Sequence, residues 1–577
     1  MLLSNLNLVA TAPDGVAKLR ELILTLAVQG KLVPQDVSDE PASVLLARVA
    51  KSLPARTAKS SNAAVNGDEI SAPYQLPNGW AWSRLGDIVE NMGSGWSPAC
   101  NEGQRSDPTK WAVLRTTAVQ VNEYRAHEHK VIPLKLSPRP EIEVKDGDIL
   151  ITRAGPMNRV GISCWVNNTP SRLMLSDKIV RFHSIADEML PAFIVLALNA
   201  GWTKNQIEEA KTGMAASQVN ISQTDLRGFW LPVCSKAEQS RIVTRVEELM
   251  RLCDALQAKA RLEATQHEQL VRTLLASLTA PTVPNATPQA QADAIQASWH
   301  RVATHFDLLL DRPEAVDALE QTILQLAVRG LLVPQDPTDE PACHLLQKIR
   351  TEKDRLIAEG KIRIDKPVAP ITEGDTPFEL PIGWQWVRFD ELTHPLKPIA
   401  YGVLVPGPDV ETGVPFVRIA DLSLTNPPSK PDKSIAPEVD AQFQRTRLEG
   451  GEILMGVVGS IGKLGVAPST WAGANIARAI CRIVPADSGL NDFVMFLLQT
   501  QFMQESFAGD TRTLAQPTLN IGLIRAALTP VPPPAEQSRI VARVASLRAL
   551  CADLRQRLTT ARTQQALLAQ VLVENVS

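Results

Sequence analysis

Three sequence blocks occur twice in this chain, in the same order and at nearly the same spacing. A period of about 300 residues is far longer than the roughly 20–50 residues of a solenoid repeat. The duplication therefore predicts two large half-molecules related by pseudo-symmetry. The matching pairs are 19–49 with 319–349, 76–82 (LPNGWAW) with 380–386 (LPIGWQW), and 237–256 with 535–554.

The segments between these blocks, residues 88–230 and 392–528, share only sparse anchors. One anchor is GDIL at 147–150 against GEIL at 451–454. A structural frame is therefore retained while most other positions differ. Two related but distinct binding specificities would produce this pattern, and simple sequence drift after duplication would produce it too.

A heptad pattern follows each copy of the third block. Steps of four and three residues from Ile242 and from Ile540 meet an apolar residue at eight and at nine of ten positions, which is typical of a coiled coil. We expect long helices at 235–278 and 533–577 that pair antiparallel; the alternative is that each packs only into its own half. The expected seam residues are Ile242, Val246, Leu249, Cys253, Leu256, Leu270, Leu274, Ile540, Val544, Leu547, Cys551, Leu554, Leu558, Leu568 and Leu572.

Shorter amphipathic helices are expected at 19–30 and 319–330, and each would end with a glycine, Gly30 or Gly330, at the C′ position. Segments rich in Ala, Ser, Pro, Thr and Gln suit exposed linkers. The expected organisation is a helical block at 1–50, a linker at 51–75, a variable domain at 76–232, a long helix at 235–278, a linker at 279–298, a second helical block at 299–378, a second variable domain at 380–530 and a long helix at 533–577.

The composition is that of a globular protein, with 44% hydrophobic and 21% charged residues. No run of about 18 apolar residues predicts a membrane span, and charges among the first thirty residues argue against a signal peptide. Seven cysteines without a CxxC pair argue against a zinc site or a disulfide framework. We expect a cytoplasmic protein that does not associate with a membrane.

Two segments come near to catalytic motifs but lack required residues. GVVGSIGKL at 456–464 fails the phosphate-loop spacing, and Leu464 follows the lysine where Ser or Thr is needed. NPPS at 426–429 lacks the aromatic fourth residue with which adenine methyltransferases stack on a flipped base. Neither has a counterpart in the other half, so we expect no catalytic residue, no metal site and no cofactor.

Together, these features resemble the specificity subunit of type I restriction–modification enzymes. The matching elements are LPxGWxW before each variable domain, the GDIL or GEIL strand, the Asn-Ile pair after it, and AEQSRIV at the start of each long helix. The resemblance covers nearly the whole chain apart from the linkers. One departure is that the first half reads LPVCSKAE at 231–238, without the proline run kept at 532–534.

The resemblance implies a mixed α/β (α+β) fold. Two pseudo-symmetric target-recognition domains with twisted β-sheets would be separated by two long antiparallel coiled-coil helices. It implies a non-catalytic subunit that recognises double-stranded DNA at an asymmetric bipartite target, one half-site per domain. The implied partners are two methyltransferase subunits and restriction subunits, which would carry S-adenosylmethionine, ATP and Mg and supply adenine-N6 methylation and ATP-dependent cleavage.

DNA affinity needs Lys and Arg at phosphates, and specificity needs Arg, Lys, Asn or Gln at base edges. The domains carry 17 basic against 16 acidic residues in 80–232 and 12 against 14 in 384–530. Partner subunits should therefore neutralise part of the phosphate charge of the DNA. Candidates at equivalent places in both halves, Arg115 with Arg418 and Asn220 with Asn520, suit framework or phosphate contacts. The candidates are Arg105, Lys110, Arg115, Arg153, Arg159, Lys211, Gln218, Asn220, Arg418, Lys463, Arg478, Arg512, Gln516 and Asn520.

Two other functions remain compatible with the residues alone. The chain would be a coiled-coil scaffold whose variable domains bind protein, or a methyltransferase or nuclease in its own right. A measurement of DNA binding would distinguish the scaffold from a subunit that reads DNA sequence. Binding of a methyl donor by the chain alone would support the enzyme.

Overall fold

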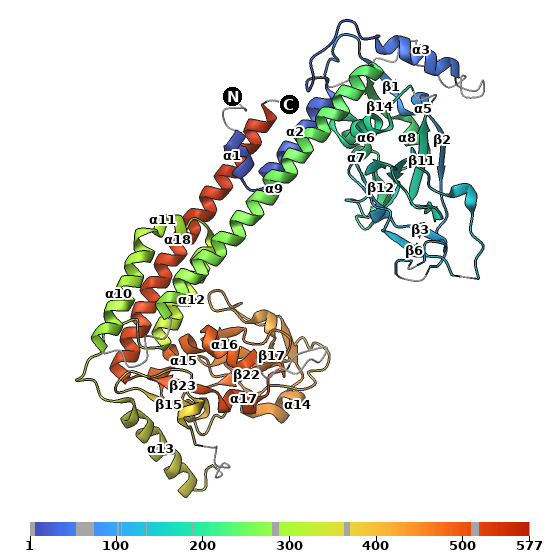
Figure 1. Ribbon diagram of the computed structural model, residues 1–577. Helices are drawn as coiled ribbons and strands as arrows, with labels where there is room; N and C mark the ends of the chain where they lie inside the picture. Colours follow the sequence, from blue (N-terminus) through green and yellow to red (C-terminus); the bar gives the residue numbers. More distant parts are fainter. Residues whose placement is uncertain are drawn as a thin grey trace. The chain divides into compact units, whose positions relative to one another are not determined.

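The computed structural model describes residues 6–52, 74–100, 103–105, 107–133, 135–185, 188–279, 288–362, 370–508 and 518–575. The chain divides into two compact units (Figure 1). The first comprises Met1–Glu263 and Arg562–Ser577, and the second comprises Ala264–Ala561. Within the described ranges, no helix is long and apolar enough to cross a membrane.

The first unit contains short helices around a set of small sheets. Its helices are α1 (Leu6–Thr11), α2 (Gly15–Val28), α3 (Ala42–Ser52), α5 (Leu85–Ile88), α6 (Pro191–Asn199), α7 (Gly201–Glu209), α8 (Gln223–Gly228) and the first part of α9 (Lys236–Thr279). Its strands are β1 (Ala81–Arg84), β2 (Val89–Ser94), β3 (Ala112–Leu114), β4 (Val119–Gln120), β5 (Glu123–Tyr124), β6 (His129–Val131), β7 (Ile149–Thr152), β8 (Ala154–Gly155), β9 (Ser163–Trp165), β10 (Leu173–Met174), β11 (Ile179–Ser184), β12 (Thr212–Ala215), β13 (Gln218–Asn220) and β14 (Trp230–Val233).

The second unit contains a similar set of elements. Its helices are α10 (Pro288–Thr304), α11 (Phe306–Leu309), α12 (Pro313–Val328), α13 (Ala342–Ala358), α14 (Pro437–Asp440), α15 (Asn491–Leu498), α16 (Gln501–Ala508), α17 (Ile521–Ala526) and most of α18 (Pro534–Glu574). Its strands are β15 (Gln385–Arg388), β16 (Ala400–Tyr401), β17 (Val414–Val417), β18 (Lys433–Ile435), β19 (Ile453–Gly456), β20 (Leu464–Val466), β21 (Asn475–Ile476), β22 (Ile480–Ile483) and β23 (Leu528–Val531).

The two units share one strand topology. A four-stranded sheet has the order β2-β11-β7-β9 in the first unit and β16-β22-β19-β20 in the second. In a three-stranded sheet, the central strand, β3 or β17, has one parallel and one antiparallel neighbour. An antiparallel pair, β1-β14 or β15-β23, joins the two ends of each variable segment. The mixed α/β class and the pseudo-symmetric halves predicted from the sequence are confirmed.

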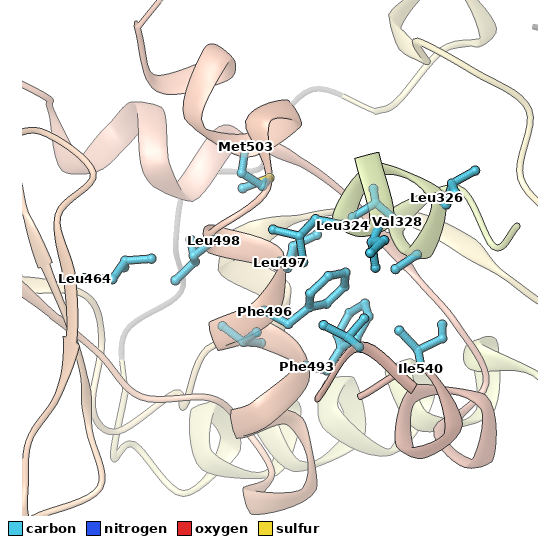
Figure 2. Close-up of a cluster of buried hydrophobic side chains, with 14 of the residues drawn as sticks. Leu324, Leu326, Val328, Leu464, Phe493, Phe496, Leu497, Leu498, Met503 and Ile540 are labelled. Atoms are coloured by element: carbon cyan, nitrogen blue, oxygen red, sulfur yellow. The ribbon is translucent and has the colours of Figure 1, made fainter. Parts of the chain in front are cut away.

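Each unit has a core that joins the variable segment to the helical block and to a long helix. The central strands β7 (ILIT) and β19 (ILMG) are buried along their whole length. Figure 2 shows the core of the second unit, where Phe493 and Phe496 of α15 share a cluster with Leu324 of α12 and Ile540 of α18. Burying one such side chain is worth about 1.5–3 kcal/mol, so this cluster holds three parts of the chain together.

The two long helices run antiparallel. In the first unit, Cys253 of α9 shares an apolar cluster with Ala569 and Leu572, near the end of α18. In the second unit, Val271, near the end of α9, shares a cluster with Cys551 of α18. The earlier part of each helix is thus grouped with the later part of the other, as the antiparallel prediction requires.

The later part of both helices also buries positions outside the heptad pattern. After Cys253 and Cys551, the next fully buried positions are Val271 and Ala569, each 18 residues further on. Eighteen residues make five turns of a straight helix at about 3.6 residues per turn, whereas a heptad seam needs about 3.5. Both helices therefore keep the straight-helix period over this interval.

Most predicted seam residues are covered, and three are not. The prediction is wrong for three leucines, which are exposed by 38%, 46% and 48%: Leu256, Leu270 and Leu568. The remaining predicted seam residues are buried or half-buried: Ile242, Val246, Leu249, Cys253, Leu274, Ile540, Val544, Leu547, Cys551, Leu554, Leu558 and Leu572.

The helices α2 and α12 end as predicted, with a glycine at C′. Gly30 and Gly330 have φ of +67° and +70°, the left-handed conformation that glycine adopts readily. There is also no room for a side chain at Gly30, because a Cβ there would lie 2.6 Å from Pro77 and 2.9 Å from Trp80. The end of α2 therefore packs directly on the LPxGWxW motif.

A buried carboxylate at the start of α9 joins the repeated blocks of the first unit. Glu238 is 3% exposed and accepts hydrogen bonds from Trp80 Nε1 at 3.0 Å and from Gln35 Nε2 at 2.6 Å. One turn later, Arg241 pairs with Asp39 at 2.6 Å. Gln35, Trp80 and Glu238 belong to the first, second and third repeated blocks, so all three blocks meet here.

The second unit repeats this arrangement, which we name the glutamate junction in both units. Glu536 is 1% exposed and accepts from Trp384 Nε1 at 3.0 Å and from Gln335 Nε2 at 2.7 Å. Arg539 pairs with Asp339 at 2.5 Å. Burial is the largest cause of the raised pKa of both junction glutamates, and the hydrogen bonds from Trp and Gln oppose it.

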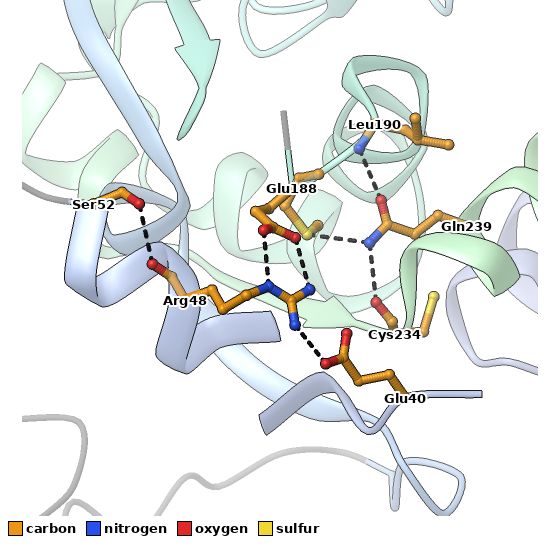
Figure 3. A network of polar contacts seen from close by, with 8 residues as sticks. Glu40, Arg48, Ser52, Glu188, Leu190, Cys234 and Gln239 are labelled. Carbon is orange, nitrogen blue, oxygen red and sulfur yellow. Dashed lines mark hydrogen bonds and ion pairs between the residues drawn. The ribbon is translucent and has the colours of Figure 1, made fainter. Parts of the chain in front are cut away.

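A second polar network in the first unit links α3 and α9 to the segment before α6 (Figure 3). Arg48 of α3 makes two hydrogen bonds of 2.8 Å to the carboxylate of Glu188. Gln239 of α9 accepts from the Leu190 N–H at 2.8 Å and donates to the Cys234 carbonyl at 3.0 Å. Together these bonds tie α3 and the start of α9 to the segment that leads into α6.

Glu238→Gln should destabilise the first unit. Glutamine keeps one acceptor oxygen, so one of the two donors now bonded to Glu238 would face an NH₂ group and lose its partner. A buried polar group left without a partner costs about 1–3 kcal/mol. Hydrogen exchange in the full chain should show faster exchange across α2, β1 and the start of α9, while the second unit is unchanged.

Glu268→Gln is the matched control, because Glu268 is 70% exposed and its pair with Arg272 lies on the surface of α9. A surface pair of this kind contributes about 0–1 kcal/mol. Equal exchange profiles for both variants would contradict the role given to the junction.

Candidate nucleic-acid interface

A three-stranded sheet, β12-β13-β8, brings three of the predicted contact residues together in the first unit. Asn220 on β13 pairs with Ala154 on β8, and the Ile221 N–H donates to the Arg153 carbonyl at 2.8 Å. Gln218 and Asn220 are exposed on one face of β13, with a buried residue between them. Amide side chains are among the types that read base edges.

Arg159 forms its hydrogen bonds within the domain. Its guanidinium donates to the carbonyls of Thr116 at 2.8 Å and Val119 at 2.7 Å, and to Gln120 Oε1 at 3.1 Å. These acceptors lie in and just before β4, which forms a hairpin with β5. Desolvation lowers the pKa of Arg159. Arg159 therefore positions the β4-β5 hairpin.

The other basic candidates of the first unit differ in how much of the side chain reaches solvent. Lys211 is only 4% exposed and pairs with Glu208 at 2.6 Å. Arg105 donates to the backbone carbonyl of Lys110 at 2.9 Å, whereas the Lys110 side chain is exposed and Arg115 is half-buried. Lys110 is therefore better placed than Lys211 to meet a phosphate.

In the second unit, Arg418 lies 3.6 Å from Asp421 and 3.5 Å from Asp432, and Lys463 Nζ donates to the carbonyl of Ile419 at 2.8 Å. The Arg478 side chain is exposed. Lys463 is exposed as well, but its ammonium already has a carbonyl partner, and Arg418 is half-buried beside two carboxylates. Two predicted contacts, Arg512 and Gln516, lie outside the described residues.

The equivalent asparagines have different local roles. Asn520 is the N-cap of α17, and its Oδ1 accepts from the Gly522 N–H at 2.8 Å. In the first unit the corresponding helix, α8, is capped by Ser222 in a capping box with Asp225, so Asn220 is not required as a cap. Asn520 thus serves the framework, while Asn220 lies on an exposed strand.

Sequence reasoning did not mark Arg139 and Trp96 as a pair. The Arg139 guanidinium lies 4.2 Å from the centroid of the Trp96 ring. Trp96 also lines, with Cys100 and Lys135, a cavity of about 470 Å³. Aromatic rings beside basic side chains suit the stacking of bases. The two residues come from separate loops, so no local pattern links them.

Among the described residues, no group of three or more His, Cys, Asp or Glu side chains could hold a metal ion. The cysteines are free thiols. Burial raises the pKa of Cys164 and Cys481 to about 12, which disfavours the reactive thiolate at these two positions.

No family model matches the chain. The chain is 46% identical over 264 residues to the type I restriction enzyme EcoEI specificity subunit of Escherichia coli, a match that covers 45% of this chain and 44% of that protein. It is 30% identical over 580 residues to the E. coli EcoAI specificity subunit, covering 97% of this chain and 93% of that protein. The chain belongs to the specificity subunits of type I restriction enzymes.

As a type I specificity subunit, the chain is a non-catalytic component of a restriction–modification system, and the scaffold alternative is not favoured. The match to the EcoEI subunit spans less than half of that protein. Among solved structures, a chain from the type I R-M system is 18% identical, with a TM-score of 0.48 and coverage of 87% and 99%. The HsdS subunit from Thermoanaerobacter tengcongensis is also 18% identical, with a TM-score of 0.37 and coverage of 88% and 98%.

Arg159→Ala should loosen the β4-β5 hairpin without unfolding the first unit. The substitution removes donors from two carbonyls and one amide oxygen, and each such bond contributes about 0.5–1.5 kcal/mol. Amide exchange over residues 116–124 should accelerate, while exchange in β7 and β11 stays the same. Lys110→Ala, at an exposed side chain, is the control. Unchanged exchange at 116–124 would show that Arg159 does not position the hairpin.

Proposed function

We propose that this chain acts in the cytoplasm and reads double-stranded DNA at an asymmetric bipartite target. One half-site would be read by the variable domain at 76–232 and the other by the variable domain at 380–530. The supporting observation is that one repeated junction frames two variable segments whose sequences share only sparse anchors. In the first unit the polar β12-β13-β8 sheet carries Gln218 and Asn220, and in the second unit Arg478 is an exposed cation.

The nearly neutral charge of the two variable domains favours a contribution of partner subunits to DNA binding. With 17 basic against 16 acidic residues in one and 12 against 14 in the other, neither offers the strongly basic surface typical of a stand-alone DNA binder. We propose that two methyltransferase subunits supply part of the phosphate contacts and the S-adenosylmethionine for adenine-N6 methylation. Restriction subunits would add the ATP- and Mg-dependent cleavage.

The two proposed kinds of contact have different requirements. Phosphate contacts need only an accessible cation, so Lys110 and Arg478 are the proposed phosphate ligands. Base reading needs donors and acceptors held in a fixed arrangement, which favours Gln218 and Asn220 on the ordered strand β13.

Exchanging residues 76–232 for the corresponding domain of a different specificity subunit should change one half-site only. The exchanged segment includes the LPxGWxW motif and ends before the long helix, so Trp80 of the incoming domain can still bond Glu238. The measurement is the methylation motif produced by the complex reconstituted with methyltransferase and restriction subunits. The matched control exchanges 380–530 and should change the other half-site. Simultaneous change of both half-sites in either chimera would contradict the two-reader proposal.

Lys110→Ala should weaken DNA binding by a similar factor on specific and random duplexes. Loss of one phosphate contact should reduce the slope of log K against log salt by about 0.9. Asn220→Ala should instead reduce the preference for the specific duplex and leave the slope unchanged. Lys259→Ala, at a side chain that is 73% exposed on α9, is the control for general charge. Identical slopes for Lys110→Ala and wild type would remove Lys110 from the phosphate contacts.

A further inference from the structure

A short loop of the second unit, which follows β16, holds two apolar side chains in solvent. Leu404 is 57% exposed and Val405 is 71% exposed. Val403, the residue before them, is 1% exposed and shares an apolar cluster with Phe416 of β17. Single exposed apolar residues are common on protein surfaces, but two in succession form a small apolar contact surface. We name Leu404 and Val405 the apolar tip.

The loop that carries the apolar tip is braced on both sides of it. Before the tip, the Val403 N–H donates to the Ile476 carbonyl at 2.7 Å. After the tip, Lys433 Nζ donates to the Gly407 carbonyl at 3.1 Å. A proline on each side of Gly407 restricts the backbone further. A loop that is already fixed loses less conformational entropy when a ligand binds it.

A cation lies beside the apolar tip. The Arg478 N–H donates to the Val403 carbonyl at 2.9 Å, so the exposed side chain of Arg478 starts from backbone next to Leu404. Arg478 is the proposed phosphate ligand of this unit. The major groove of DNA is about 12 Å wide and is bordered by phosphates on both sides. Side chains next to a phosphate contact can therefore reach the base edges.

The apolar group that a base exposes in the major groove is the 5-methyl group of thymine, and apolar side chains are the ones that contact it. Leu404 and Val405 carry no polar side-chain atom that could bond the donors and acceptors of the other bases. Thymine is therefore the base that the apolar tip fits. The adjoining guanidinium of Arg478 favours a polyanion over an apolar protein surface as the partner.

The first unit has an equivalent loop. A Cβ on Gly95 would lie 2.0 Å from the Leu175 carbonyl oxygen. In the second unit, a Cβ on Gly402 would lie 1.8 Å from the Ile476 carbonyl oxygen. The N–H of the residue after each glycine donates to that same carbonyl, at 2.9 and 2.7 Å. The two loops therefore start from the same backbone arrangement.

The side chains at this place differ between the units. Two residues beyond the glycines, Leu404 corresponds to Ser97, and two residues beyond the carbonyls, Arg478 corresponds to Asp177. Ser97 Oγ donates to Asp177 Oδ1, and the Asp177 N–H donates to Ser97 Oγ at 3.3 Å. A hydroxyl bonded to a carboxylate thus stands where the second unit has an apolar side chain and a cation. Opposite chemistry on a shared frame is expected of a position that sets specificity.

We propose that the apolar tip contacts the 5-methyl group of a thymine in the half-site read by the domain at 380–530. This inference rests on the proposed function and names one base of the target. Leu404 and Val405 would determine specificity, and Arg478 would hold the neighbouring phosphate. The first domain, with Ser97 and Asp177 at this place, would make no methyl contact there.

Uracil substitution tests this proposal, because deoxyuridine pairs as thymidine does but lacks the 5-methyl group. The probe is the specific duplex in which deoxyuridine replaces every thymidine of the half-site that the domain exchange assigns to 380–530. Competition binding is measured with the complex reconstituted with methyltransferase subunits. The wild-type complex should bind the uracil duplex about three- to fivefold more weakly, which is the effect of losing one buried methyl group.

Variants of the apolar tip should remove this preference. Leu404→Ser combined with Val405→Ser should bind the thymine and uracil duplexes equally, with an affinity close to that of the wild type for the uracil duplex. Leu396→Ser is the matched control, because Leu396 is 50% exposed in the same unit, and it should keep the wild-type preference. Uracil in the other half-site should affect the wild type and the double variant alike.

Three results would overturn the inference while specific binding persists. These are a half-site without thymine, equal binding of both duplexes by the wild type, and an unchanged thymine preference in the double variant. Weaker assembly of the double variant with methyltransferase subunits in native mass spectrometry, with the thymine preference kept, would assign the tip to a protein partner instead. A wild-type complex that binds specific and random duplexes alike would contradict the proposed function, and this inference with it.

Discussion

A carboxylate removed from water at the start of each long helix is the interaction on which the rest of the structure depends. An unpaired buried carboxylate is strongly unfavourable, so Glu238 and Glu536 require their Trp and Gln donors. Those donors come from blocks far apart in the chain. The helical block, the start of the variable domain and the long helix are therefore stable together in one arrangement. This explains why these three blocks are the ones that recur.

The duplication and the helix ends could be predicted because they depend on local chemistry and on comparison of the chain with itself. Gly30 and Gly330 needed only the rule for helix C-termini. The helix seam was harder, because the heptad pattern marks apolar positions but not which of them meet the partner helix. Leu256, Leu270 and Leu568 fit the pattern and are exposed.

The candidate contacts were predictable by residue type but not by role. Arg159 and Lys211 carry the charge expected of a DNA ligand, yet their donors are used by backbone carbonyls and a carboxylate within the domain. Such partners are remote in sequence and depend on the tertiary fold. The same reason hid Arg139 and Trp96, which become neighbours only when their loops fold. Gln218 and Asn220 lie on an exposed strand face, where a period of two residues places both toward solvent.

Repetition of the frame allows the two halves to differ without loss of the fold. The β12-β13-β8 sheet lies outside the junction bonds, and its strand β13 exposes Gln218 and Asn220. Stability is thus expected to come from the repeated parts, and specificity from the parts that differ. Mapping methylated adenines on DNA treated with the reconstituted complex tests this claim most directly. The expected result is one interrupted motif whose two half-sites differ in sequence; a palindromic or uninterrupted motif would contradict this claim.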